Sequence, residues 1–149
     1  MDTIVSKNML PGFKAEFMAV GIYVPCDNEL LFLKRAYSSS RGGYWCTPGG
    51  RIEQGENALT TARRELFEET GINIHVNDLE LRSTLYMRYP GGCDFVFYEC
   101  KLRQPLLSKP DIVLSPNEHI DFAWATLQEA EYMSLIPGEW KRIVQTFNV

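Results

Sequence analysis

Two apolar runs near the start of the chain predict β-strands. Residues 15–24 (AEFMAVGIYV) and residues 29–35 (ELLFLKR) are dominated by aliphatic and aromatic side chains, which is typical of strands buried in a sheet. Pro25, Asp27 and Asn28 lie between the runs and favour a tight turn. This pattern predicts a β-hairpin formed by the two runs.

The pattern becomes helical between residues 57 and 70. Leu59, Ala62 and Leu66 recur at spacings of three and four residues, while charged side chains occupy other positions around the helix. Gly71 follows the last periodic residue, and glycine commonly ends a helix because it adopts a left-handed conformation readily. We therefore expect an amphipathic helix over residues 57–70.

The rest of the chain alternates between strand-like and helix-like segments. The pattern predicts strands over residues 72–76, 79–89, 93–102 and 119–125, helices over residues 127–133 and 138–147, and a proline-containing loop over residues 103–117. Because strands and helices interleave, we expect an α/β fold in which helices pack on a mixed β-sheet. The sequence has no internal repeat and no linker-like stretch, so one domain over residues 1–149 is expected.

Charge and composition narrow the classes of function. The chain has 149 residues and a formal net charge of −4, which disfavours a nucleic-acid polymer as partner, because such binding needs a basic face. The N-terminal stretch lacks a basic segment followed by a long apolar run, and no stretch has the roughly eighteen apolar residues of a membrane span. We therefore expect a cytoplasmic protein without a membrane partner, with a monomer and a homodimer both open.

Three glutamates gather on one face of the predicted helix. Glu65 precedes Glu68 by three residues and Glu69 by four, and at about 100° per residue these spacings place the side chains on a common face. Like charges at this spacing repel, so a compensating cation is expected. Mg²⁺ and Mn²⁺ favour carboxylate ligands and also bind phosphates, so the cluster indicates a divalent-metal site for a phosphate-containing substrate.

The segment from residue 50 to residue 72 resembles a known family motif, the Nudix box GX5EX7REUXEEXGU, in which U is an apolar residue. The matching residues are Gly50, Glu56, Arg64, Glu65, Leu66, Glu68, Glu69, Gly71 and Ile72. A chance match to the seven invariant positions at a given start is on the order of 10⁻⁸ to 10⁻⁹ at average residue usage. TPGG at residues 47–50 and the segment 117–130 also resemble landmarks of this family. The chain is therefore identified as a member of the Nudix hydrolase family.

This resemblance implies an α/β/α sandwich and a metal-dependent hydrolase. Glu65, Glu68 and Glu69 would bind the metal together with the backbone carbonyl of Gly50. The metal would be Mg²⁺, with Mn²⁺ as an alternative. Bound to phosphate oxygens, it would offset negative charge and lower the pKa of an attacking water.

The remaining site residues are also implied by the resemblance. Arg64 would take part in catalysis by orienting the metal-binding carboxylates, and Glu56 would orient them as well. The general base would be Glu68 or Glu118, and both stay open. Arg35, at the end of a predicted strand, would contact substrate phosphates, for which its planar guanidinium is suited. The aromatic residues against which a base could stack are Tyr44, Trp45, Tyr86, Tyr89 and Phe95, and of these Tyr44, Trp45 and Tyr89 are the expected substrate-binding residues.

Cleavage would occur in a phosphoanhydride bond of a nucleoside diphosphate-linked substrate. The short chain resembles MutT-like enzymes, which hydrolyse (deoxy)nucleoside triphosphates to a monophosphate and pyrophosphate. ADP-ribose and nucleotide sugars are a first alternative, although Arg88 occupies the place of an expected proline and Pro90 lies two residues later. Dinucleoside polyphosphates are a second, because Tyr89 lies 17 residues past the box. A catalytically silent nucleotide-binding module is disfavoured by the intact carboxylates.

Overall fold

The larger of two β-sheets has five strands and mixed strand directions. The structure is a computed structural model that describes residues 2–149. Along the sheet the strands follow the order β1 (Ile4–Ser6), β7 (Leu79–Arg88), β8 (Asp94–Leu102), β2 (Ala15–Tyr23) and β6 (Gly49–Arg51). β2 and β8 are parallel, whereas the other neighbouring pairs are antiparallel. The predicted mixed sheet is therefore confirmed.

A second sheet is built around β4 (Glu29–Arg35), which pairs antiparallel with β3 (Pro25–Cys26), β5 (Trp45–Cys46) and β9 (His119–Ala125). The predicted hairpin between residues 15–24 and 29–35 is wrong, because β2 and β4 belong to different sheets. Only the short β3 pairs with β4 across the turn, where Asp27 and Asn28 have φ angles of 52° and 64°. Two successive left-handed residues form the tight turn that fits twisted strands.

Three α-helices and one 3₁₀ turn complete the described elements: α1 (Ala58–Thr70), η1 (Val76–Asp78), α2 (Leu127–Ala130) and α3 (Glu139–Phe147). α1 confirms the helix predicted over residues 57–70. At its start the Asn57 side chain accepts a hydrogen bond from the Thr60 backbone N–H, and at its end Gly71 adopts φ 79° and donates its N–H to the Phe67 carbonyl. The helix predicted over residues 127–133 is present but ends at residue 130.

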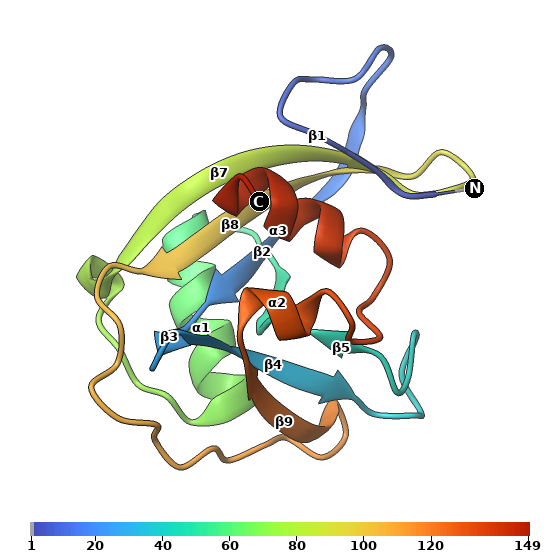
Figure 1. The fold of residues 1–149 in the computed structure, drawn as a ribbon. Helices are drawn as coiled ribbons and strands as arrows, with labels where there is room; N and C mark the ends of the chain where they lie inside the picture. Colours follow the sequence, from blue (N-terminus) through green and yellow to red (C-terminus); the bar gives the residue numbers. More distant parts are fainter. Residues whose placement is uncertain (1) are drawn as a thin grey trace.

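Helices cover both sides of the strands, so the fold has three layers. Alternate residues of β4 point in opposite directions: Leu31 and Leu33 pack in a cluster with residues of α1, whereas Leu30 and Phe32 pack with residues of α2 and α3. Figure 1 shows α1 on one side of the strands and α2 and α3 on the other. The nearly continuous apolar runs in the sequence arise because both faces of these strands are buried. The predicted α/β/α arrangement is confirmed.

The strand predicted over residues 72–76 is wrong. Apolar and polar positions alternate in this stretch as they do in a strand. Its last residues instead form local hydrogen bonds with the residues that follow. The His75 side chain accepts from the Asn77 N–H, and the Asp78 side chain accepts from the His75 N–H. These side chains give the backbone an alternative to a sheet and start the η1 turn instead.

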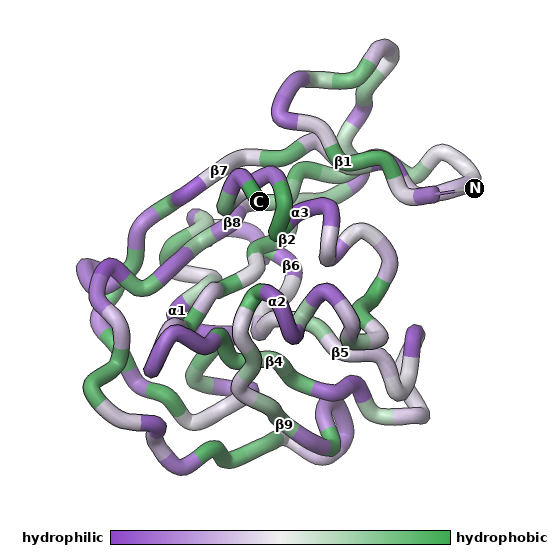
Figure 2. The backbone as a smooth tube through the Cα atoms, viewed as in Figure 1, coloured by the Kyte–Doolittle hydropathy of each residue, from purple (hydrophilic) through white to green (hydrophobic). Residues whose placement is uncertain are grey.

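The loop over residues 103–117 is confirmed as a segment without strand or helix. Figure 2 shows hydrophobic and hydrophilic positions mixed along its course around the outside of the molecule. Two hydrogen bonds fasten it to the end of α1: the Val113 N–H donates to the Thr70 carbonyl at 2.9 Å, and the Ser115 hydroxyl donates to the Glu68 carbonyl at 2.9 Å. The loop thereby brings the start of β9 next to the glutamates of α1. Within residues 2–149, no helix combines the length and hydrophobicity needed to span a membrane.

Candidate metal centre and adjoining cavity

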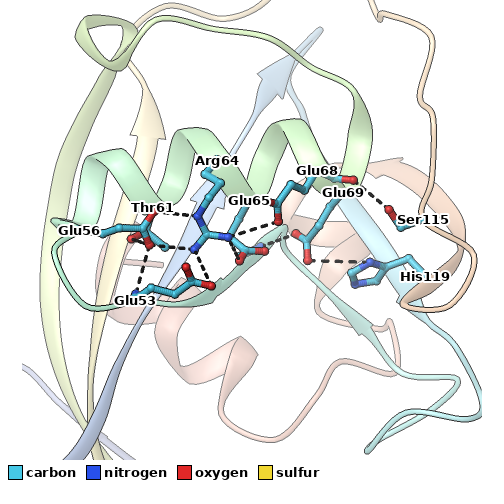
Figure 3. Close-up of polar contacts among 10 residues, drawn as sticks. Glu53, Glu56, Thr61, Arg64, Glu65, Glu68, Glu69, Ser115 and His119 are labelled. Carbon is cyan, nitrogen blue, oxygen red and sulfur yellow. Dashed lines mark hydrogen bonds and ion pairs between the residues drawn. The ribbon is translucent and has the colours of Figure 1, made fainter.

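Arg64 organises the acidic side chains at the surface of α1 (Figure 3). Its guanidinium donates to both carboxylate oxygens of Glu56, from Nε at 2.7 Å and from Nη2 at 2.8 Å. Its Nη1 donates to Glu65 at 2.8 Å and to Glu68 at 3.2 Å. Such a bidentate pair fixes the plane of the guanidinium. Arg64 therefore links the loop before α1 to two of the three predicted metal-binding glutamates.

Glu56→Gln is expected to change how folding depends on acid. The Arg64 hydrogen bonds lower the pKa of Glu56 to about 2 from its ordinary 4.5. A depressed folded-state pKa stabilises the fold above the ordinary value, and this stabilisation is lost as the pH falls from about 4.5 through about 2. Urea unfolding should show a stability gap between the unmodified chain and the Glu56→Gln variant at neutral pH that closes in this acid window. A gap independent of pH would contradict the role given to the ion pair.

Glu69 is the most deeply buried glutamate of the predicted metal site. Its residue is 4% exposed, and Oε1 accepts a hydrogen bond from the Gly49 N–H at 2.8 Å. Burial raises the pKa of Glu69 well above its ordinary value; the Gly49 hydrogen bond opposes this shift, while the Glu65 and Glu118 carboxylates add to it. Burial likewise raises the pKa of Glu65, against the opposing effect of Arg64. A divalent cation is the group that would relieve this crowding of carboxylates.

Glu118 and His119 reach the same place from the start of β9. One ligand atom from each of Glu69, Glu118 and His119 lies within 4.8 Å of the other two. Burial, followed by the effect of the Arg35 guanidinium, lowers the pKa of His119 to about 4, so its imidazole is neutral at pH 7. Glu118 is exposed, whereas Glu69 and His119 are buried, and the Glu68 side chain is likewise 54% exposed. Carboxylate oxygens and a neutral imidazole nitrogen are donors that suit a divalent ion.

The absence of a side chain at Gly50 makes room for the Glu65 carboxylate. A Cβ atom at this position would lie 2.6 Å from Cδ and 2.8 Å from Oε1 of Glu65. These distances are shorter than van der Waals contact, so the carboxylate would have to move away. The residues present therefore fit a metal ion held beside the Gly49–Gly50 backbone.

Gly50→Ala is expected to weaken metal binding while the protein stays folded. The added Cβ atom would clash only with the carboxylate of Glu65, which is the end of a flexible side chain. The carboxylate can therefore move aside and the chain can still fold. Displacing one charged ligand should raise the dissociation constant for Mn²⁺ by about tenfold or more. Calorimetric titration of the substrate-free protein measures this change, and circular dichroism checks the fold. Unchanged affinity in the folded variant would place the ion elsewhere.

A cavity of about 320 Å³ adjoins the carboxylates. Its lining includes Gly50, Glu69 and His119, and three aromatic rings, Phe17, Tyr89 and Phe97, contribute to its walls. A guanidinium lies over each ring: Arg51 is 3.8 Å from the Phe17 centroid, Arg41 is 4.6 Å from that of Tyr89, and Arg142 is 3.8 Å from that of Phe97. Flat aromatic surfaces and the guanidinium groups of Arg41 and Arg51 therefore surround one space beside the acidic cluster, which suits an anionic ligand with a planar ring.

The residues predicted to bind substrate divide into two groups. Arg35 and Tyr89 line the cavity, and Arg35 is held by a hydrogen bond from Nε to the Ser40 carbonyl at 2.8 Å. Tyr44 and Trp45 are not among the described residues that line it. Tyr44 is 45% exposed, and Trp45 packs against the apolar cluster around Tyr23 and Phe32. Their predicted contacts with substrate stay predictions.

Sequence reasoning missed several residues of the cavity. Phe97 lies opposite Ala19 in the parallel pairing of β2 and β8, and this pairing also brings Phe17 next to Phe95. Arg142 reaches the cavity from α3, where its guanidinium is buried between Glu99 and Glu139. These residues are far apart in the sequence, and nothing in the local pattern links them. His119 directly follows Glu118, and this adjacency was the one available signal.

Comparison with known proteins agrees with the geometry of this site. The family model described as NUDIX domain matches residues 16–145. A MutT-like protein of Streptomyces ambofaciens is 35% identical over 81 residues, covering 54% of this chain and 48% of its own length. Nudix hydrolase 8 of Arabidopsis thaliana is 30% identical over 146 residues, covering 93% of this chain and 37% of its own length. The chain thus spans about half or less of these relatives.

A solved structure extends the comparison to the fold. The MutT protein from Methanosarcina mazei Go1 superposes with a TM-score of 0.73 at 22% identity, covering 91% of this chain and 94% of that one. This likeness concerns the arrangement of strands and helices. The family model spans most of the chain and includes both the α1 glutamates and the start of β9. The chain therefore belongs to the Nudix hydrolase family.

Proposed function

We propose that this chain is a Mg²⁺-dependent pyrophosphohydrolase that hydrolyses a (deoxy)nucleoside triphosphate to a nucleoside monophosphate and pyrophosphate. The observation that carries the proposal is the acidic cluster of Glu65, Glu69 and Glu118 beside a cavity with aromatic walls and arginines. Nudix hydrolases depend on divalent metal ions and act on small nucleotide substrates. The names of the Streptomyces and Methanosarcina relatives support a MutT-like activity.

Each part of the site has a proposed task. Glu65, Glu68 and Glu69 would hold the metal together with the Gly50 carbonyl, and Arg64 and Glu56 would keep the carboxylates in place. The bound ion would supply positive charge at the phosphates and a water of lowered pKa. The proposed candidates for the general base are Glu68, which is more than half exposed, and Glu118, which lies with Glu69 in the cluster.

The cavity would hold the nucleoside and its phosphates. A base would stack on the rings of Phe17, Tyr89 and Phe97, since aromatic faces at such a site favour flat ligands. Arg35 also lines the cavity, and its guanidinium would bind phosphate oxygens. Because the cations face the cavity and the carboxylates border it, the triphosphate would lie between the arginines and the metal. One domain over residues 1–149 would suffice for this arrangement.

A second candidate is favoured by Tyr89. Its ring lines the cavity and is covered by Arg41, and its position 17 residues past the box is the feature that suggested a dinucleoside polyphosphate substrate. A second base would need a flat surface of its own, which the paired Tyr89 and Arg41 side chains would provide if the first base stacked on Phe17 and Phe97 alone.

A substrate panel tests the proposal. The purified chain is incubated with Mg²⁺ and nucleoside triphosphates, oxidised nucleotides, ADP-ribose, nucleotide sugars or dinucleoside polyphosphates, and the products are identified by chromatography. Highest kcat/KM on a nucleoside triphosphate, with monophosphate and pyrophosphate as products, is the expected result. Preference for a dinucleoside polyphosphate would favour the second candidate. A folded chain that turns over no member would leave the binding module as the better explanation.

A further inference from the structure

His119 presents a nitrogen atom to the acidic cluster from a buried position. The residue is 3% exposed and is the first residue of β9, where it pairs with Arg35 of β4. Its Nδ1 lies 4.0 Å from Oε2 of Glu69. Figure 3 marks this contact with a dashed line. The ligand atoms of Glu69, Glu118 and His119 all lie within 4.8 Å of one another. A nitrogen and two carboxylates therefore share one small volume.

The Nδ1 atom is buried without a hydrogen-bond partner among residues 2–149. Buried polar atoms are rarely left unpaired, because an unsatisfied group carries a desolvation penalty. The other ring nitrogen, Nε2, lies 3.9 Å from Sγ of Cys46. With its N–H on that side, the ring directs the Nδ1 lone pair at Glu69 and Glu118. A cation between these three electron-rich atoms would give the unpaired Nδ1 a partner and offset the charge of the carboxylates.

The distances suit a shared metal ion. A divalent ion binds carboxylate oxygen and imidazole nitrogen at about 2.0–2.2 Å, so two ligands of one ion lie at most about 4.0–4.4 Å apart. The 4.0 Å between Nδ1 of His119 and Oε2 of Glu69 falls inside this limit. The three ligand atoms lie within 4.8 Å of one another, which is slightly wider than this limit. The exposed Glu118 side chain can close the difference by a small movement toward the other two ligands.

We propose that Nδ1 of His119 is a ligand of a divalent ion held together with Glu69 and Glu118. The proposal rests on the metal dependence of the proposed function, but it adds a nitrogen to a centre otherwise built from oxygens. Imidazole favours Mn²⁺ and later first-row metals relative to Mg²⁺, which prefers oxygen ligands. This subsite should therefore select Mn²⁺ over Mg²⁺ more strongly than carboxylates alone would.

Pulsed electron paramagnetic resonance of the Mn²⁺-loaded full chain, without substrate, tests the ligand directly. A directly bound imidazole nitrogen produces ¹⁴N modulation of the Mn²⁺ echo. The chain has two histidines, so His75→Asn is the matched control, because His75 is exposed and lies in η1's cap. The modulation should persist in His75→Asn and disappear in His119→Asn. Asparagine is chosen at both positions because its side chain is polar and smaller than the imidazole.

Metal selectivity provides a second readout. The ratio of the Mg²⁺ and Mn²⁺ dissociation constants, measured by competition, should fall about tenfold in His119→Asn and stay unchanged in His75→Asn. If His119→Asn does not fold, the unmodified chain grown with ¹⁵N-histidine answers the question, because ¹⁴N modulation should give way to ¹⁵N coupling.

The outcomes separate this proposal from the proposed function. Absence of histidine coupling in the unmodified chain, or coupling that survives in folded His119→Asn, would overturn the ligand assignment. Metal-dependent turnover without histidine coupling would leave the proposed function standing alone. Histidine coupling without turnover on any substrate would leave the metal ligand standing alone.

Discussion

Glu69→Gln is expected to lower kcat about a thousandfold and, at the same time, to raise the stability of the metal-free protein. If Glu69 binds the metal as proposed, its loss removes several kcal/mol of charge stabilisation in the transition state, and each 1.36 kcal/mol corresponds to about tenfold in rate. The glutamine keeps an oxygen that can accept the Gly49 hydrogen bond of 2.8 Å, so the fold should be retained. The glutamine side chain is neutral, so the variant lacks the buried Glu69 carboxylate, whose pKa is raised by burial and by the charges of Glu65 and Glu118.

The opposite signs of these two effects make the result diagnostic. A folded-state pKa above the ordinary value means that the ionised Glu69 destabilises the metal-free fold at neutral pH. Urea unfolding in EDTA measures the stability, and steady-state kinetics with Mg²⁺ measures kcat. Glu131→Gln is the matched control, because Glu131 is exposed and lies outside the cavity lining; neither quantity should change. A Glu69→Gln variant that is less stable without metal would show that Glu69 is a structural residue.

Arg142→Met should be the most destabilising single substitution considered, at about 3–5 kcal/mol. Arg142 is 2% exposed, and its Nη1 donates to Oε1 of Glu99 at 2.7 Å. Its Nη2 forms an ion pair with Glu139, which also accepts a hydrogen bond from the Thr47 N–H at 2.7 Å. Both glutamates are fully buried. Methionine preserves much of the volume but leaves two buried carboxylates without a cation, and that uncompensated charge is the source of the expected loss.

Arg82→Met provides the surface comparison for Arg142. The Arg82 side chain is 38% exposed and lies 3.5 Å from the Glu80 carboxylate, so its loss should change stability by less than about 0.5 kcal/mol. Urea unfolding of each variant measures the change in stability as a shift of the unfolding midpoint. An unchanged dependence of the unfolding free energy on urea concentration shows that the shift reflects stability alone. The triple variant Arg142→Met, Glu99→Gln, Glu139→Gln should regain part of the lost stability, because it removes the stranded charges. Equal effects of Arg142→Met and Arg82→Met would show that the buried ion network does not hold α3 to the sheet.

Features encoded by neighbouring residues were predictable from the sequence. α1 follows from the spacing of Leu59, Ala62 and Leu66, and its end follows from the conformational freedom of Gly71. The long strands β7 and β8 also agree with their content of aliphatic and aromatic residues. The three box glutamates could be placed near one another because a single helix carries them. Each of these features depends on interactions between residues that are only a few positions apart in the sequence.

Features that depend on distant pairing were not predictable. The parallel contact between β2 and β8 separates β2 from β4, which contradicts the hairpin suggested by the turn at Asp27 and Asn28. The short strands β5 and β6 have little pattern of their own and exist because longer strands pair with them. The cavity walls come from β2, β8 and α3, so Phe97 and Arg142 gave no local signal. Glu118 could be proposed only through the family resemblance, since the loop over residues 103–117 carries it to α1.

The most direct test is the dependence of nucleotide hydrolysis on Mg²⁺. The preferred substrate is incubated with the unmodified chain in EDTA, then with excess Mg²⁺, and the release of nucleoside monophosphate is followed. If the buried carboxylates hold the catalytic ion, turnover is absent in EDTA, returns on addition of Mg²⁺, and does not return in Glu69→Gln. Turnover that persists in EDTA, or that Mg²⁺ restores equally in Glu69→Gln, would contradict a metal-dependent centre at these residues.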